Sequence, residues 1–92
     1  MFYYVYVLKS KQDGSLYVGY TVSLEKRLKE HNQGKNVSTK SNIPWTCVYY
    51  EACLDSKDAK RRESYLKTGG GQTMLKLRLK QYLYEHRSRN IG

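Results

Sequence analysis

The chain has 92 residues, 39% of them hydrophobic and 27% charged, which predicts one globular domain over residues 1–92. No apolar run approaches the roughly 18 residues of a membrane span, which excludes a transmembrane helix. The net charge is +9, and residues 57–92 carry ten basic side chains against three acidic ones. This basic half indicates a polyanionic partner, most often nucleic acid, although a charged surface that serves only solubility is the alternative.

The first elements in the chain form a predicted β-hairpin. Residues 2–9, FYYVYVLK, are rich in aromatic and β-branched side chains, which is typical of a strand. Asp13-Gly14 is a strong turn signal, and residues 15–20, SLYVGY, are the expected return strand. Gly19 inside that strand indicates a bulge or a close backbone approach.

A helix is expected next, from a cap at Ser23 to a stop at Gly34. Its apolar positions, Leu24 and Leu28, lie four residues apart and define the buried stripe. Arg27 and His31 form a second pair with the same spacing beside that stripe. Residues 35–45 are polar and end in Ile43-Pro44, so a loop is predicted there.

Residues 45–54, WTCVYYEACL, are the third predicted strand, mostly buried. Cys47 and Cys53 are six residues apart, so both are expected on the same side of the strand. No further ligands in CxxC-type pairs accompany them, which argues against a zinc site. We therefore predict reduced core thiols in a cytoplasmic protein.

Two more helices complete the prediction. Ser56 is the expected cap of the first, in which Ala59, Glu63 and Leu66 recur on one core-facing stripe. The run from Thr68 to Gly71 should end it, and residues 72–87 should form the second. The result is an α/β fold of order β-β-α-β-α-α, a three-stranded antiparallel sheet flanked by helices, with a core over about 3–80 and a basic C-terminal tail, 87–92.

Polar side chains from four of these elements should converge. Tyr6 and Tyr17 come from the paired strands of the hairpin, and Arg27 and His31 come from the helix that follows. Glu63 lies on the core-facing stripe of the next helix, where a carboxylate is unfavourable unless it is paired or binds a metal. The chain contains no P-loop, dinucleotide turn or HExxH motif that would suggest another chemistry.

At this point the chain resembles the GIY-YIG nucleases. Tyr4-Val5-Tyr6 corresponds to the first motif, with tyrosine in place of the usual first glycine, and Tyr17-Val18-Gly19 corresponds to the second. The spacing to Arg27 and His31 also follows the family, and the segment around Glu63, DAxxRE, resembles that of its metal-binding glutamate. Tyr20 stands where some relatives carry lysine, and Gln72 is the candidate for the family's late asparagine. The likeness covers roughly residues 3–80 and is closest to the small single-domain bacterial members.

The resemblance implies a metal-dependent endonuclease that hydrolyses phosphodiester bonds in DNA, selects structure or shape, and acts in repair or recombination. It implies Glu63 as the ligand of Mg²⁺ or Mn²⁺ and Arg27 as a clamp on phosphate oxygens. Tyr6 or Tyr17 would activate the attacking water, with a pKa lowered by Arg27 and the metal, and His31 would assist. The predicted substrate-binding residues are Gly19, which would admit the substrate backbone, and Tyr20, Lys60, Arg61, Arg62 and Lys67.

Each of these residues also has a plain structural interpretation. The two tyrosines could be hairpin core residues, Arg27 could pair with Glu25 or Glu30, and Glu63 could form a buried ion pair with Arg27 or Arg62. For the whole protein, the alternatives are a nucleic-acid-binding module without turnover and a catalytic subunit that needs a partner protein for targeting. DNA is favoured over RNA as the substrate, and no membrane partner is expected.

Overall fold

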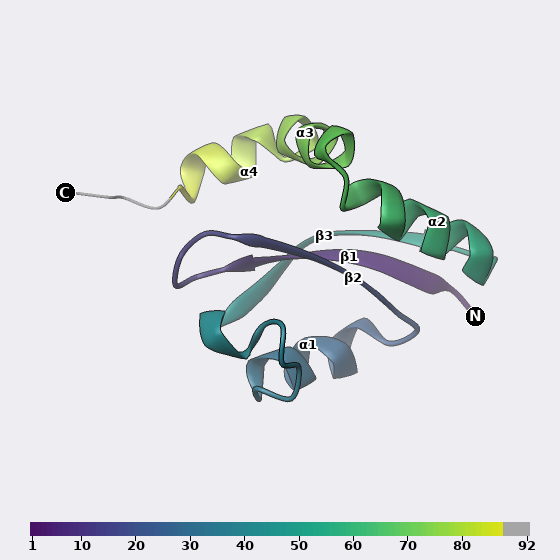
Figure 1. Ribbon diagram of the computed structural model, residues 1–92, viewed down its shortest axis with the longest axis horizontal. Helices are drawn as coiled ribbons and strands as arrows, with labels where there is room; N and C mark the ends of the chain where they lie inside the picture. The colour runs from purple at the N-terminus through teal and green to yellow at the C-terminus, as the bar shows by residue number, and fades with distance from the viewer. Residues whose placement is uncertain (88–92) are drawn as a thin grey trace.

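The computed structural model describes residues 1–87. A three-stranded antiparallel sheet of order β2-β1-β3 forms its middle layer. Helix α1 covers one face of the sheet, and α2, α3 and α4 lie on the other (Figure 1). The predicted α/β architecture is confirmed. The elements are β1 (Tyr3–Ser10), β2 (Leu16–Thr21), α1 (Leu24–Asn32), β3 (Trp45–Cys53), α2 (Ser56–Leu66), α3 (Gly69–Arg78) and α4 (Lys80–Glu85).

The central strand supplies two separate cores because its side chains alternate between the faces of the sheet. Val5 and Val7 are buried on the face covered by α2 and α3, where they pack with Ala59, Leu66 and Leu75. On the opposite face Tyr6 and Leu8 are buried with Trp45, against Leu24 and Leu28 of α1. Tyrosine therefore has a core position on the α1 side, within reach of polar groups of that helix.

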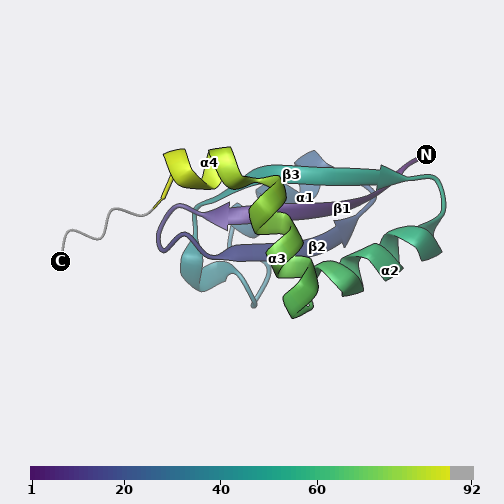
Figure 2. The same cartoon turned by 90° about the horizontal axis from the view of Figure 1, so that it is seen from above.

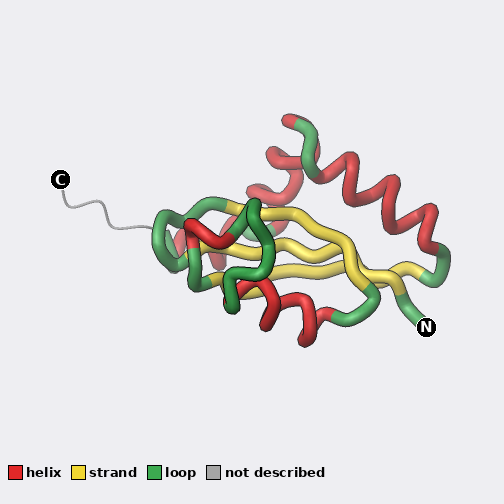
Figure 3. The backbone as a smooth tube through the Cα atoms, turned by 60° about the horizontal axis from the view of Figure 1, so that its bottom comes forward, coloured by secondary structure: helices red, strands yellow, loops and turns green. Residues whose placement is uncertain are grey.

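The hairpin pairs as the sequence predicts, with Tyr6 opposite Gly19 and Leu8 opposite Tyr17. Gly14 in its turn has a φ of 78°, a left-handed conformation that favours glycine. Figure 3 shows the face of the sheet that carries α1 and the long loop after it, which contains a short 3₁₀ helix, Lys40–Asn42.

Strand β3 contains an irregularity that the sequence did not reveal. Val7 lies opposite Tyr49 and Leu8 lies opposite Cys47, so Val48 is an extra residue on β3. The extra residue reverses the alternation of side chains. Cys47 consequently packs on the α1 side and Cys53 on the α2 side, so the prediction that both face the same way is wrong. Both thiols are free and half-buried, and much of the strand is less buried than expected.

The helix ends also differ from the prediction. Asp55, not Ser56, caps α2, since its side chain accepts a hydrogen bond from the Lys57 amide. Thr68 caps α3, so the three glycines after it begin a helix instead of ending one. A Cβ at Gly71 would overlap the backbone of Tyr65 and Leu66, which explains why glycine is needed where α3 begins beside the end of α2.

The single helix expected over residues 72–87 is two helices. The backbone leaves helical geometry at Leu79, with φ −102° and ψ 19°, and α4 begins at the next residue. This break turns the chain, so that α3 crosses over the strands and α4 lies near the β1–β2 turn (Figure 2). Of the predicted basic tail, residues 88–92 lie outside the described part. No helix within residues 1–87 is long and apolar enough to cross a membrane.

Candidate active site

A chain of buried hydrogen bonds links β1 to the loop after α1. The Tyr6 hydroxyl lies 2.8 Å from Nε2 of His31, and Nδ1 of His31 lies 2.8 Å from Oγ1 of Thr39. All three residues are buried. The sequence predicts the first two members. It does not predict Thr39, because a threonine in a polar loop carries no signal of its own.

Local packing fixes this geometry. A Cβ at Gly19 would overlap the phenol end of Tyr6, so the glycine opposite Tyr6 makes room for its hydroxyl. This packing explains why glycine is needed at position 19 even when no substrate is considered. The expected contact of Gly19 with the substrate backbone stays a prediction. The Tyr17 ring flanks the pair, with its centroid 5.1 Å from that of His31 and 6.5 Å from that of Tyr6.

Arg27 stands between the buried tyrosine and solvent. Its Nε donates to the Tyr6 hydroxyl at 3.4 Å, and its Nη1 pairs with Glu30 at 3.1 Å. The side chain is 38% exposed. The guanidinium therefore serves a structural pair and still offers donors at the surface above Tyr6, where a phosphate oxygen could reach it.

The ionisation of this group differs from the expectation. Burial raises the pKa of Tyr6 above its usual range, and the hydrogen bond and charge of Arg27 offset only part of that effect. Arg27 lowers this pKa, as expected, but burial raises it by more, so the net shift in the free protein is upward. Burial, with the nearby Arg27 charge, lowers the pKa of His31, so the imidazole is neutral at pH 7.

A neutral imidazole has one donor nitrogen and one acceptor nitrogen. When the proton is on Nδ1 of His31, that nitrogen donates to Thr39, whose hydroxyl lies 3.4 Å from the Asn36 carbonyl. Nε2 is then free to accept the Tyr6 hydroxyl proton. In this tautomer each donor in the chain has an acceptor, and the phenol is set up to transfer its proton inward.

Glu63 approaches from α2, on the other side of the sheet from Tyr6. Its carboxylate pairs with Lys67 at 3.0 Å, and the side chain is 22% exposed. The alternative partners named from the sequence, Arg27 and Arg62, are therefore wrong. Burial is the main cause of the raised pKa values of Tyr6 and Tyr20, and the charge of Glu63 contributes to both. Glu63 thus acts electrostatically on both tyrosines, although it lies on a different element.

The remaining predicted substrate residues fall into two groups. Near Glu63, Lys67 pairs with the carboxylate and Lys60 lies over the Tyr20 ring, 5.5 Å from its centroid. In the second group, Arg61 pairs with Asp58 at 3.0 Å, and Arg62 forms three hydrogen bonds with Glu51. The Arg61 pair lies within α2, whereas the Arg62 pair links α2 to β3, and substrate contact by any of these residues stays a prediction.

Glu51 and Gln72 have structural roles. Burial alone would raise the pKa of the Glu51 carboxyl, but hydrogen bonds from Arg62 and Tyr49 lower it below its usual value. This pair joins β3 to α2. Gln72, the candidate counterpart of the family's asparagine, donates its side-chain amide to the Leu66 carbonyl at 2.7 Å, so it caps the end of α2.

Within residues 1–87, no three His, Cys, Asp or Glu side chains come together as a metal cluster. A single carboxylate is nevertheless a suitable protein ligand for Mg²⁺, which keeps several waters and binds substrate phosphate. Glu63 fits this role by its chemistry, since its carboxylate is partly exposed and its charge contributes to the raised pKa of Tyr6.

Comparison with known proteins agrees with this fold. The family model described as the GIY-YIG catalytic domain matches residues 2–74. The matched range contains all five residues predicted to be catalytic. The chain therefore belongs to the GIY-YIG family, a family consisting generally of endonucleases.

Similar proteins carry the family label UPF0213. One from Staphylococcus haemolyticus is 43% identical over 76 residues, which cover 82% of this chain and 92% of the relative. One from Clostridium perfringens is 46% identical over 65 residues, covering 70% and 69% of the two chains. The solution NMR structure of a UPF0213 protein from Bacillus halodurans matches with a TM-score of 0.54 at 32% identity, covering 100% of this chain and 99% of that one.

Proposed function

We propose that this protein is a metal-dependent endonuclease that hydrolyses phosphodiester bonds in DNA. The observation that carries the proposal is the buried pair of Tyr6 and neutral His31 beside the half-exposed Arg27. The family supplies the reaction class, and this arrangement supplies a proton path and a phosphate clamp for it. Tyr17, Gly19 and Tyr20 complete the proposed surface, with Lys60, Arg61, Arg62 and Lys67 as phosphate contacts.

In the proposed mechanism, Tyr6 accepts a proton from the attacking water as its own hydroxyl proton passes to Nε2 of His31. A phenol is a weak base near neutral pH. Because Tyr6 passes its own proton to His31 as it accepts one from water, its pKa need not be lowered. Arg27 binds the non-bridging phosphate oxygens and stabilises the charge that develops there. Thr39 holds the imidazole in the tautomer that can accept.

Glu63 is the proposed ligand of Mg²⁺ or Mn²⁺. When bound, the cation would neutralise phosphate charge and assist the leaving oxygen. Lys67, which pairs with Glu63, would then face the phosphate itself. A structure- or shape-selective substrate, as in repair or recombination, is part of the proposal, since this domain by itself offers little surface for reading base edges.

The test is cleavage of labelled single-stranded, duplex and branched DNA with Mg²⁺ or Mn²⁺, with binding measured on the same samples. We expect Tyr6→Phe, Arg27→Ala and Glu63→Gln each to lose cleavage by about a hundredfold or more while binding survives. Glu25→Gln is the matched control, because Glu25 is an exposed carboxylate on α1. Binding without cutting by wild type on every substrate would instead support the non-catalytic module or the subunit that needs a targeting partner.

A further inference from the structure

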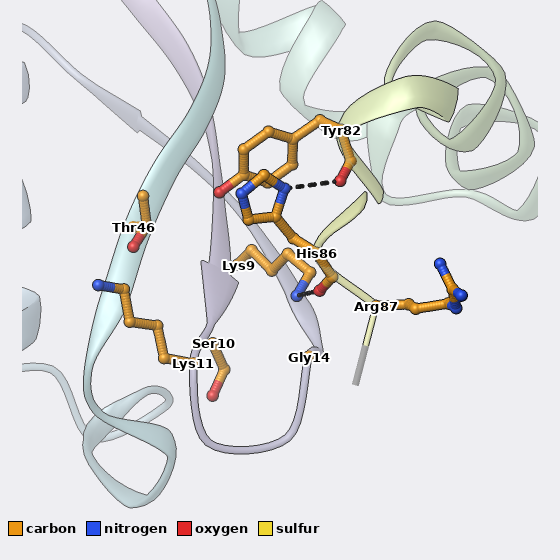
Figure 4. Close-up of a pocket in the computed structure, with 8 residues that line it drawn as sticks. All are labelled: Lys9, Ser10, Lys11, Gly14, Thr46, Tyr82, His86 and Arg87. Carbon is orange, nitrogen blue, oxygen red and sulfur yellow. Dashed lines mark hydrogen bonds between the residues drawn. The ribbon is translucent and has the colours of Figure 1, made fainter. Parts of the chain in front are cut away.

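A hollow lies at the opposite end of the hairpin from the entry to α1. It encloses about 410 Å³ between the β1–β2 turn, the start of β3 and the end of α4 (Figure 4). Nothing in the proposed reaction uses it. Its lining residues are Lys9, Ser10, Lys11, Gly14, Thr46, Tyr82, His86 and Arg87.

The hollow is basic and contains no large aliphatic side chain. Three of the lining residues are cationic, Lys9, Lys11 and Arg87, and none is a carboxylate. Lys9 donates to the His86 carbonyl at 2.9 Å, which holds its ammonium group at the wall, and Lys11 reaches from the turn toward Thr46 (Figure 4). Because no acidic group in the lining neutralises these cations, an anion is the complementary ligand.

One wall of the hollow is an aromatic platform. The rings of Tyr82 and His86 are stacked, with centroids 4.0 Å apart and an interplanar angle of 12°. Tyr82 covers one face of the imidazole, and His86 as a whole is exposed. A flat exposed ring beside cations is the arrangement with which proteins bind a base and its phosphate together.

We propose that this hollow binds one nucleotide of a nucleic-acid strand, with its phosphate against Lys9 and Lys11 and its base against His86. This inference rests on the proposed nuclease function and extends it. Lys9 is three residues from Tyr6, about 10 Å along the strand, and its side chain points to the other face of the sheet. The nucleotide bound here would therefore lie on the other face of the sheet from Tyr6, at a distance from the reacting phosphate, and the chain would hold a strand at two points.

An anionic membrane surface is the competing partner for a basic patch. Insertion into a membrane needs exposed apolar side chains beside the cations, and the lining of this hollow has none. The stacked rings, in contrast, have a direct use in binding a base. The observations therefore favour nucleic acid.

The test measures binding of the full chain to a labelled single-stranded oligonucleotide in the presence of a chelator, so that cleavage does not interfere. The double variant Lys9→Gln with Lys11→Gln removes both cations placed against the phosphate and should bind about tenfold more weakly, with a log–log salt slope reduced by about 1.4. His86→Ala should weaken binding about fivefold, but should not affect binding of an oligonucleotide that lacks bases. The matched control is the double variant Lys29→Gln with Lys35→Gln, which also removes two cations, both of them exposed and on the α1 side. It should change binding less than twofold.

Wild-type affinity in both the double variant and His86→Ala would overturn the proposal. So would tight binding to phosphatidylserine vesicles that depends on Lys9 and Lys11 without any effect of His86→Ala on the oligonucleotide. The two proposals fail separately. If wild type cuts DNA and the variants bind normally, only the proposed second site is wrong. If the variants bind more weakly but wild type never cuts, only the proposed nuclease function is wrong.

Discussion

At the scale of single residues, the hydroxyl of Thr39 is the least expected part of the site. It lies 2.8 Å from Nδ1 of His31, and no other partner of that nitrogen is present among the described residues. A threonine from the loop after α1 and a tyrosine from β1 thereby hold the same imidazole, one at each ring nitrogen. Thr39 is a positioning residue in this scheme, since it acts through His31.

Thr39→Val should test this role, because it keeps the shape and removes the hydroxyl. We expect a loss of about 1–3 kcal/mol in the free energy of unfolding, since Nδ1 is left buried without a partner. Cleavage should fall further than stability explains, with a changed pH profile, because the imidazole is no longer held in one tautomer. Denaturant unfolding and cleavage rates across pH measure both effects. Thr39→Ser should behave nearly as wild type, and an equal loss in both variants would contradict the hydroxyl's role.

The lowered pKa of His31 also predicts a dependence of stability on pH. Burial, together with Arg27, opposes protonation in the folded state, while Glu30 favours it less strongly. The unfolded chain therefore takes up this proton first, at a pKa of about 6.5. Stability is full above about pH 6.5 and should fall as the pH drops below it, toward the lower pKa of the folded state. Urea unfolding between pH 7.5 and 5.5 tests this, and a flat profile would contradict it.

At the scale of elements, the junction of α2 and α3 is the tightest point. Gly71→Ala should destabilise the protein by about 1–3 kcal/mol, because the added Cβ overlaps the backbone of Tyr65 and Leu66. Gly69→Ala is the matched control in the same helix, since a Cβ there meets nothing within 4 Å. It should be neutral or slightly stabilising. Thermal unfolding of the two variants decides the point, and similar midpoints would show that α3 can move away from α2.

The elements themselves were largely predictable from local pattern. Alternating aromatic and β-branched residues, an Asp-Gly turn and the spacing of Leu24 and Leu28 indicate the hairpin and the first helix by local rules. The three glycines after Thr68 were misread, because a glycine run normally ends a helix. Here the close approach of α2 requires glycine at position 71. That approach depends on how α2 and α3 pack against each other, which the local sequence pattern does not reveal.

At the scale of the whole molecule, the charge of +9 should make nucleic-acid binding depend strongly on salt. If about five cations contact phosphates, the logarithm of the affinity should fall with the logarithm of the salt concentration with a slope of about −4 to −5. Titrations of labelled duplex DNA at several salt concentrations measure it. A slope near zero would remove nucleic acid as the partner of this basic surface.

Motif spacing and strand alternation are properties of the chain read in order, so they indicate the family, the antiparallel hairpin and the site residues other than Thr39. The tertiary structure decided that Thr39 completes the hydrogen-bonded chain, that Glu63 pairs with Lys67, and that Cys47 and Cys53 face opposite ways. It also decided that the pKa of Tyr6 is raised. Burial and hydrogen-bond partners depend on residues that are distant in sequence, and they set the ionisation of the tyrosine and histidine that the motif spacing indicates.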